Sequence, residues 1–310
     1  MRVRIIIIVV GMICVLLVGS LYVYIFRRKT IMVFHAGSLT VPFQIYATMF
    51  EEQYDVSVRL YAGGSRKLAM EIVSLGKRPD MYASADYKLI ETMLMPNFTS
   101  WYIIFATNEI VLAYTRNSRY AGEINSSNWW RILNRSDVRW GHSDPDLDPC
   151  GYRALIVIKL AERYYGVRGL FDSLMSSENR IIRPKSVDLL SLLESGELDY
   201  AFEYKSVAIQ HNLSFVSLPR EINLGDWDMA EYYAQANITL SDGSVVFGEP
   251  IAYGITILNE APNKDLAIRF VKLILERPGV LERCGQNAIT PAIASNIDAL
   301  PEELRGYVRG

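Results

Sequence analysis

Strand-like and helix-like hydrophobic patterns alternate along the chain after residue 29. Residues 30–35 and 56–61 are short runs rich in β-branched and aromatic side chains, and each leads into a glycine-serine turn. The segments that follow, residues 40–54 and 66–75, space their apolar side chains as amphipathic helices do. Because strand, turn and helix recur in this order, the pattern predicts an α/β fold with a mainly parallel sheet covered by helices.

The same pattern continues towards the C-terminus. It predicts strands at residues 81–83, 110–115, 200–204 and 251–258, and helices at residues 149–165, 186–195, 205–210 and 264–276. The first and last groups of elements resemble each other, which predicts two lobes joined by two hinge crossings, near residues 110 and 250. Lobe 1 would then comprise residues 30–110 and 253–310, and lobe 2 residues 111–252.

The N-terminus differs from the rest because residues 5–26 form an apolar run without a charged side chain. As a helix rising about 1.5 Å per residue, this run would extend roughly 33 Å, which is enough to cross the hydrocarbon core of a bilayer. We therefore predict that residues 1–29 are an N-terminal transmembrane anchor or a signal segment, and that the remainder is a water-soluble domain outside the cell. Basic residues flank the run on both sides, so they do not decide its orientation.

The overall composition excludes several classes of function. Lys and Arg total 32 and Asp and Glu total 34, for a net charge of −2, so the chain lacks the basic excess of a nucleic-acid-binding protein. The three histidines, His35, His142 and His211, are too scattered for a zinc site. No Gly-x-Ser-x-Gly nucleophile motif occurs, so we expect neither an enzyme nor a resident cofactor. Cys150 and Cys284 could form a disulfide outside the cell.

Small polar residues recur where predicted strands turn into helices. They occur at Gly37-Ser38, Gly64-Ser65, Asp148-Pro149-Cys150-Gly151 and Lys185-Ser186. A helix start offers unpaired N–H groups and the positive end of the helix dipole, so several starts facing one cleft would bind a dianion without lysines. Tyr204 could add a phenolic donor. The alternative is that these residues are ordinary helix N-caps.

Four motifs resemble the archaeal molybdate/tungstate-binding proteins of ABC transporters. They are His35-Ala-Gly-Ser-Leu39, Ala83-Ser-Ala-Asp-Tyr87, Asp148-Pro-Cys-Gly-Tyr-Arg153 and Tyr200-Ala-Phe-Glu-Tyr-Lys-Ser206. The resemblance implies a two-lobed, periplasmic-binding-protein-like fold that closes on an oxyanion. It also implies that the protein is a monomer and docks on a permease driven by a cytoplasmic ATPase. It also implies a set of ligand positions: Gly37, Ser38, Ser65, Asp148, Pro149, Cys150 and Tyr204.

One position departs from the family pattern. The family often has Glu in an Arg-Pro-Lys-Glu-x-Asp-Leu motif, where this Glu and the Asp of the Asp-Pro-Cys motif raise the coordination of the metal above four. Ser186 replaces that Glu here. We therefore predict that Ser186 binds the oxyanion through its hydroxyl or its backbone N–H, and that Asp148 is either a direct ligand of the metal or a helix cap. Sulfate and phosphate remain rival ligands, and an anchored sensor with the same fold remains an alternative function.

Overall fold

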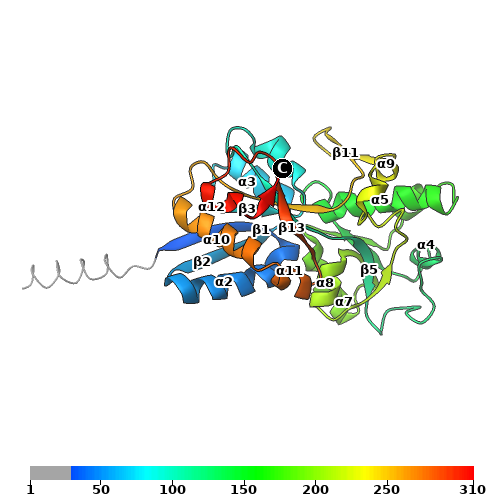
Figure 1. Ribbon diagram of the computed structural model, residues 1–310. Helices are drawn as coiled ribbons and strands as arrows, with labels where there is room; N and C mark the ends of the chain where they lie inside the picture. Colours follow the sequence, from blue (N-terminus) through cyan, green and yellow to red (C-terminus); the bar gives the residue numbers. More distant parts are fainter. Residues whose placement is uncertain (1–28) are drawn as a thin grey trace, which may run out of the picture.

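The computed structural model describes residues 29–310, which fold into two α/β lobes lying side by side (Figure 1). The apolar run at residues 5–26, predicted as an anchor, lies outside the described residues. Within residues 29–310, no helix combines the length and the apolar character needed to cross a membrane.

Lobe 1 is built on a seven-stranded sheet with the strand order β14-β13-β4-β12-β3-β1-β2. Its strands are β1 (Thr30–Ala36), β2 (Ser57–Gly63), β3 (Met81–Ser84), β4 (Ile103–Thr107), β12 (Ala252–Ile257), β13 (Asn287–Ala294) and β14 (Val308–Arg309). Its helices are η1 (Gly37–Leu39), α2 (Thr40–Tyr54), α3 (Ser65–Val73), η2 (Ile90–Leu94), α10 (Lys264–Glu276), α11 (Gly279–Arg283) and α12 (Glu302–Arg305).

Lobe 2 is built on a five-stranded sheet with the strand order β7-β6-β8-β5-β9 and carries a separate two-stranded hairpin. Its strands are β5 (Ile110–Tyr114), β6 (Trp140–Ser143), β7 (Arg180–Arg183), β8 (Tyr200–Tyr204), β9 (Ser214–Ser217), β10 (Asn237–Thr239) and β11 (Val245–Phe247). Its helices are α4 (Trp129–Leu133), α5 (Pro149–Tyr164), α6 (Leu170–Met175), η3 (Ser186–Leu189), α7 (Leu190–Ser195), α8 (Lys205–Gln210), η4 (Trp227–Met229) and α9 (Ala230–Tyr233).

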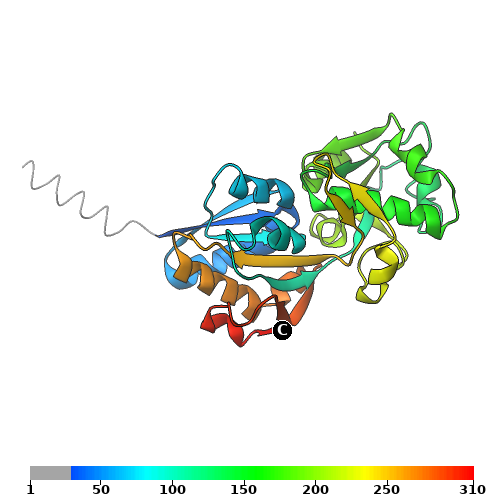
Figure 2. The same ribbon diagram turned by 90° about the horizontal axis from the view of Figure 1, so that it is seen from above.

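The chain passes between the lobes at two places, after β4 and before β12, and both crossing segments are visible in the view from above (Figure 2). These crossings also explain why the prediction of a mainly parallel sheet is wrong. Strand β12 returns from lobe 2 and inserts between β3 and β4, and it runs antiparallel to both. In lobe 2, β5 likewise pairs antiparallel with β8 and β9, whereas β6 pairs parallel with β7 and β8.

Helices cover both faces of the lobe 1 sheet because the side chains of β1 alternate between the two faces. Ile31 and Val33 are buried in the cluster that includes α2 and α10, where the rings of Phe43 and Phe270 meet edge to face with centroids 6.2 Å apart. Phe34 lies in a second buried cluster with residues of α3. The strand-turn-helix pattern of the sequence therefore corresponds to a sheet with a helix layer on each face, and the turns lie at one edge of the sheet.

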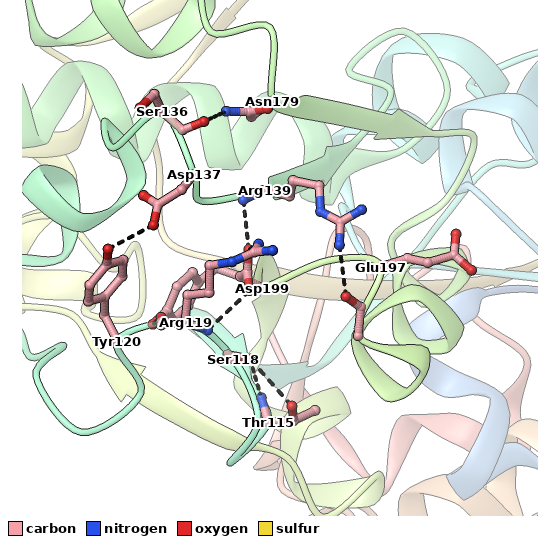
Figure 3. A network of polar contacts seen from close by, with 12 residues as sticks. Thr115, Ser118, Arg119, Tyr120, Ser136, Asp137, Arg139, Asn179, Glu197 and Asp199 are labelled. Atoms are coloured by element: carbon pink, nitrogen blue, oxygen red, sulfur yellow. Dashed lines mark hydrogen bonds and ion pairs between the residues drawn. The ribbon is translucent and has the colours of Figure 1, made fainter.

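A buried carboxylate secures the long connection between β5 and β6 in lobe 2 (Figure 3). Asp199 is 4 % exposed and accepts hydrogen bonds from the backbone N–H groups of Arg119 (3.1 Å) and Arg139 (2.8 Å). The guanidinium of Arg119 also donates to it at 2.8 Å. Three donors thus compensate for the burial of one charge, and the connection is fixed to the start of β8.

The two cysteines of the described chain are both buried and free. Cys150 lies at the start of α5 and its thiol faces the Phe202 carbonyl oxygen at 3.7 Å, while Cys284 lies after α11 in the other lobe. The disulfide that the sequence allowed between them is absent from the structure.

Candidate functional site

Helix starts from both lobes meet where the lobes touch. The first residues of η1 and α3 face the loop before α5 and the start of η3, and the contact at Gly64 leaves no room for a β-carbon. A β-carbon on Gly37 would lie 3.2 Å from Val187 Cγ2, and one on Gly64 would overlap the Leu147 carbonyl oxygen. The Lys67 N–H donates to that same carbonyl oxygen at 3.0 Å. The lobes are therefore closed on each other at this edge.

Three buried hydroxyl groups at this junction each accept a hydrogen bond from a protein donor. Ser38 Oγ accepts from the Tyr253 hydroxyl at 3.0 Å, and Ser65 Oγ accepts from the Ala85 N–H at 3.0 Å. Tyr204 Oη accepts from the guanidinium of Arg153 at 2.8 Å. A hydroxyl group has a single hydrogen, and these bonds engage the oxygens as acceptors. Each hydroxyl therefore keeps its own hydrogen available for a ligand.

The alternative that the predicted site residues are ordinary helix caps holds for only one of them. The helices at Gly37, Thr40, Ser65 and Ser186 have no side-chain cap hydrogen bond. Asp148, in contrast, caps α5, where its Oδ1 accepts from the Cys150 N–H at 3.3 Å. The serine hydroxyls are thus left for other partners.

Asp148 also accepts a hydrogen bond from the backbone N–H of Ser186, the group that the sequence suggested as a donor to the oxyanion. Its Oδ2 accepts from the Ser186 N–H at 2.8 Å, so one carboxylate joins the starts of two helices. Burial raises the pKa of Asp148 to about 6, and the hydrogen bonds from the Ser186 and Cys150 N–H groups act in the opposite direction. In this arrangement both carboxylate oxygens have protein donors. Pro149 occupies the first turn of α5, where no N–H is needed.

A buried ion pair that the sequence analysis missed joins the lobes behind the hydroxyl groups. Arg153 on α5 lies 3.6 Å from the Asp86 carboxylate of lobe 1, and both side chains are at most 5 % exposed. The same guanidinium donates to the Ala85 carbonyl oxygen at 2.6 Å, and the Tyr152 hydroxyl donates to Asp86. Asp86 and Arg153 each lie within one of the four motifs quoted above, and this position was the only sign in the sequence that they belong to the site. Arg153 thus brings a formal positive charge beside the Tyr204 hydroxyl, and the Asp86 carboxylate balances it.

These contacts cross between the lobes at four places. The crossings are Gly37 to Val187, Gly64 to Leu147, Ala85 to Arg153, and Tyr204 to Tyr253, whose ring centroids are 6.0 Å apart. Of the predicted site residues, Gly37 is partly buried, and the buried ones are Ser38, Ser65, Asp148, Pro149, Cys150, Ser186 and Tyr204.

Three further titratable side chains are buried in the two lobes: Glu203, His35 and His142. Burial raises the pKa of the Glu203 carboxyl well above its usual range, and Glu203 Oε1 has no hydrogen-bond partner in residues 29–310. Glu203 is fully buried, so its carboxyl is not on the surface of the protein. Burial also lowers the pKa of His35 and of His142 to about 4 in each case, so both imidazoles are neutral at pH 7. Across residues 29–310, no three His, Cys, Asp or Glu side chains are arranged to hold a metal ion.

Comparison with known families agrees with the two-lobed architecture. Residues 31–280 match the family model described as bacterial extracellular solute-binding protein. The chain belongs to this family. Membership indicates a role in binding a solute rather than in catalysis.

Relatives of this solute-binding protein confirm the resemblance that the motifs indicated. It is 43 % identical to the molybdate/tungstate-binding protein WtpA of Pyrococcus abyssi, over 91 % of this chain and 90 % of the relative. It is 44 % identical to the protein of the same name from Thermococcus kodakarensis, over 91 % of this chain and 88 % of the relative. A solute-binding protein from Petrotoga mobilis is 45 % identical, over 96 % of both chains.

Solved structures show the same fold at low sequence identity. The periplasmic molybdate-binding protein of Azotobacter vinelandii aligns with a TM-score of 0.60 at 19 % identity, over 83 % of this chain and 98 % of that one. The sulfate-binding protein SubI of Mycobacterium tuberculosis aligns with a TM-score of 0.63 at 12 % identity, over 84 % and 88 % of the two chains. The fold is thus shared by receptors named for different oxyanions.

Proposed function

We propose that this protein captures molybdate or tungstate outside the cytoplasm and delivers it to an ABC-transporter permease driven by a cytoplasmic ATPase. The observation that carries the proposal is the set of buried hydroxyls at Ser38, Ser65 and Tyr204, each engaged as an acceptor by a protein donor. Molybdate and tungstate are fully deprotonated near neutral pH and offer only acceptor oxygens, so they suit a site whose hydroxyls all donate. The names of the WtpA relatives support the same ligands.

The proposed ligand is held as a tetrahedral oxyanion. Both oxygens of Asp148 accept backbone N–H groups, and Ser186 replaces the second carboxylate of the family pattern. Asp148 then acts as the cap that orients the starts of α5 and η3 instead of binding the metal. X-ray absorption of the tungstate complex should show four short tungsten–oxygen bonds, and a six-coordinate spectrum would contradict this part of the proposal. Binding in Asp148→Ala should weaken as the two helix starts lose their common acceptor.

The cellular context of the proposal is an N-terminal anchor within residues 1–29 that holds a monomeric binding domain at the outer side of the cell membrane. It is supported by the uncharged run at residues 5–26 and by membership of an extracellular family. Membrane fractionation of tagged chain tests the anchor, because a cleaved segment would leave the domain in the soluble fraction.

Calorimetry of the full-length chain in mild detergent tests the ligand assignment. Molybdate, tungstate, sulfate, phosphate and perrhenate are titrated at pH 7, and we expect molybdate and tungstate to bind at least 100-fold more tightly than the others, which is about 3 kcal/mol. Sulfate binding as tight as tungstate binding would refute the assignment.

A further inference from the structure

A buried polar cluster connects both hinge crossings to the Ser38 hydroxyl. Asn108 follows β4 at the first crossing, Tyr253 lies in β12 after the second crossing, and Ser206 lies in α8 of lobe 2. Asn108, Ser206 and Tyr253 are each at most 2 % exposed. The cluster therefore lies where the lobes rotate relative to each other, and it extends to the candidate site.

The direction of each hydrogen bond in this cluster is fixed by the backbone. Asn108 Oδ1 accepts from the N–H groups of Glu109 (2.9 Å) and Ser206 (3.4 Å), so the carboxamide oxygen must face them. Its NH2 group then faces the other way and donates to Ser206 Oγ (2.7 Å) and to Tyr253 Oη (3.0 Å). Because Tyr253 Oη accepts from Asn108, its only hydrogen is directed at Ser38 Oγ, 3.0 Å away.

We propose that Tyr253 is a specificity-determining residue, which holds the Ser38 hydroxyl as a donor and thereby disfavours oxyanions that carry a proton. The inference rests on the proposed function, since it concerns the same site. Hydrogen phosphate has an O–H that needs an acceptor, whereas molybdate and tungstate have none. To accept that proton, the Ser38 hydroxyl would have to point its own hydrogen away from the ligand. If it pointed towards Tyr253, it would meet the hydroxyl hydrogen that Tyr253 already directs at Ser38 Oγ.

The variant Tyr253→Phe removes this constraint while it preserves the ring. Without the Tyr253 hydroxyl, the Ser38 hydroxyl can rotate and either donate or accept. We expect tungstate binding to weaken about tenfold, because a directed hydrogen bond to a charged ligand loses its fixed donor. The affinity for hydrogen phosphate should fall much less, since the rotated Ser38 hydroxyl can accept a hydrogen bond from its O–H group. The tungstate-to-phosphate affinity ratio should therefore fall at least fivefold.

The measurement is calorimetry of the full-length chain with tungstate at pH 7, followed by displacement of tungstate with phosphate. Tyr46→Phe is a matched control, because Tyr46 is a buried tyrosine of lobe 1 whose hydroxyl donates to the Arg277 carbonyl oxygen at 2.8 Å, away from Ser38. This control should leave the affinity ratio unchanged. A second variant, Ser38→Ala, tests the route of the effect, since adding Tyr253→Phe to it should not change the ratio further.

The outcomes separate this inference from the proposed function. Equal weakening of tungstate and phosphate in Tyr253→Phe would mean that the residue has only a structural role, and it would overturn the inference while the ligand assignment stands. A persistent effect of Tyr253→Phe in the Ser38→Ala background would also overturn it. If the unmodified chain bound no tungstate, the proposed function would fail, and the inference would fail with it.

Discussion

The ion pair between Asp86 and Arg153 should control closure of the lobes rather than stability of the fold. The two groups lie on different lobes, 3.6 Å apart and almost completely buried. We predict that Asp86→Asn weakens oxyanion binding but changes the unfolding temperature of the ligand-free chain little. Opening of the lobes would return the unpaired Arg153 guanidinium to water, so the loss of the Asp86 charge destabilises only the closed form.

The size of the effect follows from the geometry. At 3.6 Å and an effective dielectric constant of about 20, the attraction between two unit charges is about 4 to 5 kcal/mol. Removal of one partner from a buried pair typically costs about 3 to 5 kcal/mol. Arg153 keeps its hydrogen bonds to the Ala85 carbonyl oxygen and to Tyr204, which favours the lower end. About 3 kcal/mol corresponds to a dissociation constant roughly 100-fold higher.

Asp199→Asn provides the matched control for this prediction. Asp199 is equally buried and pairs with Arg119 at 2.8 Å, but both residues belong to lobe 2, so opening cannot relieve the loss (Figure 3). It should lower the unfolding temperature and leave the intrinsic oxyanion affinity nearly unchanged. Calorimetry gives the affinities and thermal unfolding gives the stabilities. The reasoning is refuted if Asp86→Asn lowers the unfolding temperature as much as Asp199→Asn while its affinity stays within threefold of the unmodified chain.

Two further predictions concern closure and pH. Gly64→Ala should weaken oxyanion binding at least tenfold, because the new β-carbon would overlap the Leu147 carbonyl oxygen, whereas Gly122→Ala, which has open space around it, should bind normally in the same titration. Acidification from pH 7 to pH 4.5 should lower the free energy of unfolding. The pKa values of His35 and His142 are lowered to about 4 in the folded chain, so the stabilisation from their neutral forms is lost as the pH falls from 6.5 through 4. Each histidine contributes up to about 3 kcal/mol to this loss. Urea unfolding of His142→Gln should show a smaller loss than the unmodified chain, and an equal loss would contradict the assignment.

The sequence predicted the parts of the fold that have a strong local pattern. The helix at residues 40–54 and the strand at 200–204 coincide with α2 and β8. The apolar residues of α2 mark its one buried face, and β8 is an apolar run that is buried along its whole length. The sequence did not predict β13 or the short edge strand β14, whose pairing depends on segments far away in the chain. The antiparallel insertion of β12 likewise depends on the return of the chain from lobe 2, which no local pattern records.

The candidate site was predictable to a similar degree. Turns at Ser38, Ser65 and Asp148 were visible because a strand that gives way to a helix places small polar residues there. The partner of each hydroxyl was not visible. Tyr253 stands 215 positions from Ser38 and in an ordinary strand pattern, so only the folded chain brings them together.

The contacts between the lobes have a consequence for the kinetics of release. Because they cross between the lobes at four places, the proposed oxyanion would leave the junction only after the lobes have separated there. The residence time of the proposed ligand then depends on how often the lobes separate, and a ligand that stabilises the closed form more strongly lengthens it. Two oxyanions of different affinity should accordingly differ mainly in how long each keeps the lobes closed, and a permease that pulls the lobes apart would shorten that time for either.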